Sequence, residues 1–89
     1  MSTKQIIINE VKLGSYFDSV ALMQLSKRVG SIVGVEEAAV MMGSTANKQI
    51  LSNAGLLNEK GHLAGGNDMI IAVRAETQDY AENAIIETK

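Results

Sequence analysis

The sequence contains no cysteine and no proline, and His62 is its only histidine. The lack of cysteine excludes disulfides and thiolate metal ligands, and a single histidine cannot form a metal cluster by itself. We therefore expect no metal and no cofactor. No nucleophile with a neighbouring base is evident either, and such a pair is what covalent or acid–base catalysis needs.

Strong charge and long apolar runs are also missing. The net charge is −2, which provides no basic surface for nucleic acid. The longest apolar runs, Ile6-Ile7-Ile8 and Met69 to Val73, are far shorter than the roughly 18 residues of a membrane span. The N-terminus lacks the layout of a signal peptide. We therefore expect a cytoplasmic protein that binds neither nucleic acid nor membrane.

What the chain does contain is a regular alternation of strand-like and helix-like segments within one expected domain, residues 1–89. Helical crossovers favour a mainly parallel or mixed sheet, so we predict a small α/β domain of order βαβαβα with three strands covered by helices. A ferredoxin-like arrangement is compatible with this order. The expected strands are 5–13, 35–42 and 68–75, and the expected helices are 18–31, 45–54 and 76–89.

Two details of this prediction concern position in the sheet. The second strand becomes apolar on both faces at Met41 and Met42, which is typical of a central strand. Residues 58–67 combine glycine, asparagine and charge without periodicity, which indicates a flexible surface loop. A three-stranded sheet leaves the apolar start of the first strand uncovered, so we expect a homo-oligomer or a part of a larger assembly.

The turn between the second strand and the second helix is the first candidate ligand site. A helix N-terminus has backbone N–H groups without partners and favours an anion, and a glycine lets backbone approach closely. The alternative is an ordinary capped helix with Lys48 in solvent. The candidate residues for a small anion are Gly43, Ser44, Thr45, Ala46, Asn47 and Lys48.

Gly14 and Ser15 form the corresponding turn after the first strand. If the first two strands are parallel neighbours, both turns open at the same end of the sheet. Ligands of open α/β folds bind at this end. Asp18 or Ser15 is expected to cap the first helix. Arg74, at the end of the third strand, could bind a carboxylate or phosphate, or it could be a solvated or intersubunit residue. His62 is expected to be exposed and idle.

Three blocks of sequence carry a family resemblance over most of the chain: 12–20, 35–48, and Asn67-Asp68 with 72–76. They resemble the N-terminal domain of FdrA-type proteins, which are acyl-CoA synthetase-like and related to the α subunit of succinyl-CoA synthetase. The chain departs from the family pattern Gly-Thr-Pro-Ala-Asn-Lys by having Ser44-Thr45 and no proline. FdrA-type proteins continue into CoA-binding and ligase-like domains that do not follow Lys89, so CoA binding is not expected here.

The resemblance implies a role in purine and allantoin breakdown, linked to an oxamate carbamoyltransferase activity. On that basis we expect a stand-alone, non-catalytic assembly or regulatory subunit that meets carbamoyltransferase or ligase-like subunits. Two alternatives remain open. One is an oligomeric enzyme that holds carbamoyl phosphate, phosphate or an oxamate-like carboxylate at an interface, with Lys48, Arg74 and helix amides. The other is a ligand-sensing module for such a small anion.

Overall fold

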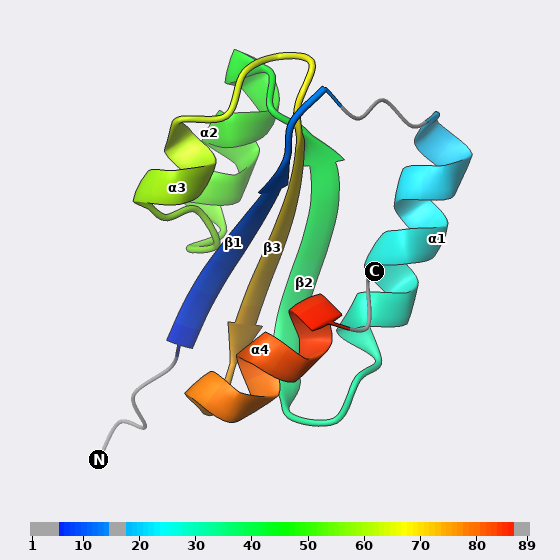
Figure 1. Cartoon of the computed structure of the whole chain (residues 1–89), viewed down its shortest axis with the longest axis vertical. Coiled ribbons are helices and arrows are strands. Elements are labelled where there is room, and N and C mark those ends of the chain that lie inside the picture. The colour runs from blue at the N-terminus through cyan, green and yellow to red at the C-terminus, as the bar shows by residue number, and fades with distance from the viewer. Residues whose placement is uncertain (1–5, 15–17, 87–89) are drawn as a thin grey trace.

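The computed structural model describes residues 6–14 and 18–86. The α/β fold with alternating strands and helices is confirmed, and each expected strand and helix forms within a few residues of its expected bounds. The elements are β1 Ile6–Lys12, α1 Ser19–Gly30, β2 Val35–Met42, α2 Thr45–Asn53, α3 Glu59–His62, β3 Met69–Ala75 and α4 Gln78–Ile86 (Figure 1).

The strands pair antiparallel throughout, whereas we expected a mainly parallel or mixed sheet. The order is β1-β3-β2, and β3 pairs antiparallel with both neighbours. β1 and β2 do run in the same direction, but β3 lies between them. β2 is therefore an edge strand and not the central one. The prediction was wrong because burial of both faces reflects the helical layers above and below the sheet, and these cover edge strands as well.

Helices cover both faces of the sheet. On one face α1 and α4 contribute Val29 and Ala81 to a buried cluster with Ile71 and other β3 residues. On the other face Leu51 of α2 packs with Ile70. β3 is buried on both faces, as its alternating side chains require at the centre of a three-layer domain. No helix in the described ranges is long and apolar enough to cross a membrane.

Side-chain caps fix where the helices begin. Asp18 accepts a 2.8 Å hydrogen bond from the N–H of Ala21, and Ser44 accepts a 3.2 Å hydrogen bond from the N–H of Asn47. Each cap satisfies one of the N–H groups that a helix leaves unpaired in its first turn. Asp18 is one of the two residues that the sequence predicted as the cap of the first helix.

The segment expected to be a flexible loop contains the four-residue helix α3, so that prediction was wrong in part. The reason is the buried Asn9 of β1, which is 2% exposed. Its amide donates to the carbonyl of Leu56 at 2.8 Å and accepts from the N–H of Asn58 at 2.8 Å. Any side chain at Gly61 would overlap Asn9, so glycine lets α3 lie directly against β1.

Candidate functional site

The turns after β1 and β2 meet at the start of β3, around the carboxylate of Asp68. The N–H of Gly14 donates to one carboxylate oxygen at 2.8 Å, and the N–H of Gly65 donates to the other at 2.8 Å. The N–H of Gly43 donates to the main-chain carbonyl of Asp68 at 2.8 Å. We expected the two turns at one end of the sheet if β1 and β2 were parallel neighbours. The two strands run in the same direction but are not neighbours, and β3 between them joins the two turns.

The surroundings of Asp68 favour its charged form. The backbone hydrogen bonds from Gly14 and Gly65 lower the pKa of the Asp68 carboxyl below its usual value, and the charge of Lys48 lowers the pKa further. Amides that could have received an external anion therefore already bind a carboxylate of the chain itself. At this end of the sheet, Asp68 is thus hydrogen-bonded to the turns that contain Gly14, Gly43 and Gly65.

The predicted anion site from Gly43 to Lys48 makes several internal hydrogen bonds. The side-chain amide of Asn47 donates to the carbonyl of Met42 at 3.0 Å, and the ammonium group of Lys48 donates to the carbonyl of His62 at 2.8 Å. A shallow hollow of about 250 Å³ lies beside this helix start. It is lined by Thr45, Lys48, Gln49, Ser52, Leu57 and His62.

This hollow places Gln49, Ser52 and His62 beside Thr45 and Lys48, which the sequence had assigned to the anion site. Thr45, Lys48, Gln49 and Ser52 share one face of α2 because they recur at helical spacing. His62 joins them because α3 folds back beside α2, and it was expected to be idle. The helical spacing could have identified Gln49 and Ser52 in advance, whereas the position of His62 depends on α3.

Arg74 lies apart from this hollow. It pairs in register with Ile7 and Glu37, near the far end of β3 from the Asp68 turn. Its guanidinium group donates to the carbonyl of Ala54 at 2.9 Å and to the carboxylate of Glu37 at 2.8 Å. Arg74 therefore connects the end of α2 to β2, and Lys48 and Arg74 are not brought to one site. Ser15 lies outside the described residues.

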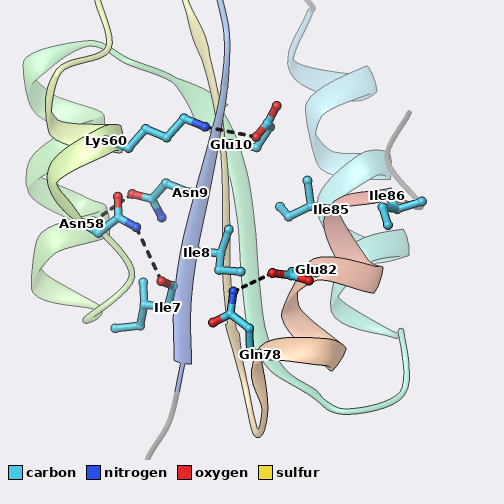
Figure 2. Close-up of a pocket in the computed structure, with 10 residues that line it drawn as sticks. All are labelled: Ile7, Ile8, Asn9, Glu10, Asn58, Lys60, Gln78, Glu82, Ile85 and Ile86. Atoms are coloured by element: carbon cyan, nitrogen blue, oxygen red, sulfur yellow. Dashed lines mark hydrogen bonds and ion pairs between the residues drawn. The ribbon is translucent and has the colours of Figure 1, made fainter.

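A hollow of about 510 Å³ follows the outer edge of β1. Figure 2 shows α3 on one side of this edge and α4 on the other. We call it the β1 groove. Its lining includes Ile7, Ile8, Asn58, Lys60, Glu82 and Ile86.

The two sides of the β1 groove have different chemistry. On the α3 side, the Asn58 amide lies 3.5 Å from the carbonyl of Ile7, and Lys60 reaches the carboxylate of Glu10 at 3.3 Å. On the α4 side, Ile86 is 62% exposed. The groove thus combines an open strand edge with an exposed apolar wall, a combination suited to an extended polypeptide.

Comparison with known families identifies the class of this protein. A family model described as AllF, heavy metal-associated domain, matches residues 2–89, and the chain belongs to this family. This description does not name acyl-CoA synthetases, so the link to FdrA-type proteins stays a prediction.

Among curated relatives, the chain is similar to the uncharacterized protein YahF of Escherichia coli strain K12. The identity is 37% over 87 residues, which are 98% of this chain and 16% of YahF. The chain thus spans about a sixth of the length of that relative. No solved structure matches the chain.

The family description names a heavy metal, so the fit of such an ion can be tested on the residues. Soft metal ions bind thiolate and imidazole groups, and this chain has no cysteine and one histidine. The described residues contain no group of three or more histidine, cysteine, aspartate or glutamate side chains able to hold a metal. The residues present do not fit a heavy-metal centre.

Proposed function

We propose that this chain is an assembly domain, without catalysis of its own, of an AllF-type system in allantoin breakdown. The AllF family match supports the pathway, and the resemblance to FdrA-type proteins adds the oxamate carbamoyltransferase connection. In this proposal the chain works in the cytoplasm and holds carbamoyltransferase or ligase-like subunits together.

The observation that carries this proposal is the β1 groove. A strand edge has main-chain N–H and C=O groups that can pair with another chain, and natural domains usually cover such an edge. Here the edge begins with Ile6, Ile7 and Ile8 and lies beside the exposed Ile86. An apolar open edge is a surface for binding polypeptide.

Co-purification tests this assembly role. The tagged chain is expressed with the carbamoyltransferase and ligase-like subunits of its own system, and the complex is analysed by size-exclusion chromatography. We expect co-elution, and we expect Ile7→Lys to abolish it by placing a charge at the strand edge. Ile50→Lys is the matched control, because Ile50 is an exposed apolar residue of α2 away from the groove. Separate elution of the wild-type chain from every such subunit would contradict the proposal.

A second candidate function is the binding of a small anion in the hollow beside α2. It is favoured by the cationic Lys48 together with hydroxyl and amide groups on one helix face. Thermal unfolding is measured with phosphate, carbamoyl phosphate and oxamate, for the wild type, Lys48→Ala and the control Lys27→Ala. A ligand at 100 times its dissociation constant adds about 2.7 kcal/mol to stability. A shift lost only in Lys48→Ala supports this function, and no shift with any anion excludes it.

A further inference from the structure

The outer edge of β2 is covered at Val40 by a side chain of its own domain. The hydroxyl of Ser26 in α1 accepts from the N–H of Val40 at 2.8 Å and lies 3.4 Å from the carbonyl of the same residue. The register of β2 also shifts between Val35 and Glu37. A bulge and a bound hydroxyl both prevent another strand from pairing. A partner strand is therefore not expected at β2.

The outer edge of β1 is closed along only part of its length. Lys60 crosses this edge to reach Glu10, and the Lys60 side chain is 61% exposed. Towards the start of the strand, the described residues place only the 3.5 Å contact from Asn58 over the carbonyl of Ile7. Among the described residues, the stretch from Ile6 to Ile8 is thus the least covered part of this edge, and it is the apolar part.

We propose that a second copy of this chain pairs through β1, antiparallel and about a two-fold axis close to Ile7. This inference rests on the proposed assembly role and specifies one contact within it. The antiparallel arrangement places Ile7 opposite Ile7 of the second copy and Ile6 opposite Ile8 of the second copy. Three consecutive β-branched residues are therefore complementary to themselves, and cross-strand pairs of this type stabilise a sheet.

The positions of the side chains agree with this pairing. Ile6 and Ile8 face the layer that contains Ile85 of α4, while Ile7 alternates to the α3 side, as Asn9 does. A second β1 strand in the groove would extend both layers, with its isoleucines against Ile86, which is exposed in the single chain. The result is a continuous six-stranded sheet.

The test is the molar mass of the full chain by light scattering over a range of concentrations. The expected result is a dimer for the wild type and for Ile50→Lys, and a monomer for Ile7→Lys with its circular dichroism unchanged. A dissociation constant that rises on the order of tenfold or more for Ile7→Lys supports the pairing. A monomeric wild type at every concentration overturns the inference, as does a dimer that Ile7→Lys leaves intact.

These outcomes are separable from the assembly role itself. A chain that is monomeric alone but co-elutes with other subunits, and loses them on Ile7→Lys, disproves pairing with a second copy and leaves the assembly role standing. A chain that dimerises as proposed but binds no other subunit keeps this inference and removes the wider assembly role.

Discussion

The two edges of the sheet differ in how the chain covers them. β2 has Ser26 bound to both main-chain groups of Val40, a shift in register, and Glu37 paired with Arg74. Among the described residues, β1 has one ion pair across its edge and a 3.5 Å hydrogen bond from the Asn58 amide to the Ile7 carbonyl, and the apolar stretch from Ile6 to Ile8 has no further contact of this kind. Specific side-chain contacts thus cover the β2 edge, whereas the apolar part of the β1 edge is less covered. For this reason we expect a partner to bind at the β1 edge.

The largest expected effect comes from Asn9→Ala, which removes the anchor between β1 and the α3 wall of its groove. The carbonyl of Leu56 and the N–H of Asn58 each lose a buried partner. We expect the free energy of unfolding to fall by about 3 kcal/mol, because each buried polar group left unpaired costs about 1–3 kcal/mol. Urea unfolding followed by circular dichroism measures the change. Asn53→Ala, on exposed α2 surface, is the control, and an equal effect of both variants would contradict the anchor role.

The next effect concerns the closed edge. Ser26→Ala leaves the N–H and carbonyl of Val40 without the hydroxyl. The expected loss of stability is about 1–2 kcal/mol, with Ser52→Ala on the exposed face of α2 close to neutral. Hydrogen exchange measures the local change, since the Val40 amide should exchange faster in Ser26→Ala. An unchanged exchange rate there would show that β2 is covered by something other than Ser26.

Asp68 links the turns that follow both edge strands, and its effect depends on pH. Its pKa is lower in the folded chain than in the unfolded chain, because Gly14 and Gly65 donate to the charged carboxylate. The stabilisation is therefore complete above the unfolded-state pKa of about 4 and is lost as the pH falls through the lower folded-state pKa.

Urea unfolding midpoints measured between acidic and neutral pH test whether the stabilisation by Asp68 is lost as the pH falls. Asp68→Asn is expected to unfold at lower urea than the wild type at neutral pH, and the difference should shrink in acid as the wild-type carboxylate becomes protonated. A difference that is constant over this pH range would mean that the charge of Asp68 has no part in holding the turns.

The smallest expected effect is that of Glu10→Gln, which removes the ion pair across the β1 edge. The pair is partly exposed, so the free energy of unfolding should fall by less than about 1 kcal/mol. High salt should abolish the difference between variant and wild type, because screening weakens the pair in the wild type. A larger or salt-independent loss would show that Glu10 also stabilises the chain by contacts other than this ion pair.

The helices and strands could be predicted from the sequence because their signals are local. The alternation of Val11 and Leu13 with Glu10 and Lys12 predicted β1, and Ser44 before a helical stretch predicted the start of α2. The meeting of the turns after β1 and β2 followed from the direction that a helical crossover gives to the second strand.

Strand order and long-range contacts could not be predicted in this way. Met41 and Met42 suggested a central strand, yet burial by helices on both faces occurs at an edge as well. α3 depends on Asn9, which lies 49 residues before Asn58 in the chain. Nothing in the local sequence pairs these two residues. We grouped Arg74 with the anion site because its side chain is cationic. The strand register instead places it near the end of β3 that lies far from Asp68.

Disulfide trapping tests the pairing of β1 most directly, because the chain has no cysteine of its own. In an antiparallel pair the opposite residues lie about 4.5–5.5 Å apart between Cα atoms, a distance that a disulfide spans. We predict that Ile7→Cys forms a covalent dimer rapidly under mild oxidation, whereas Ile50→Cys forms one slowly through random collisions. Equal rates for the two variants would contradict the account, because they would mean that the β1 edges of two copies do not meet.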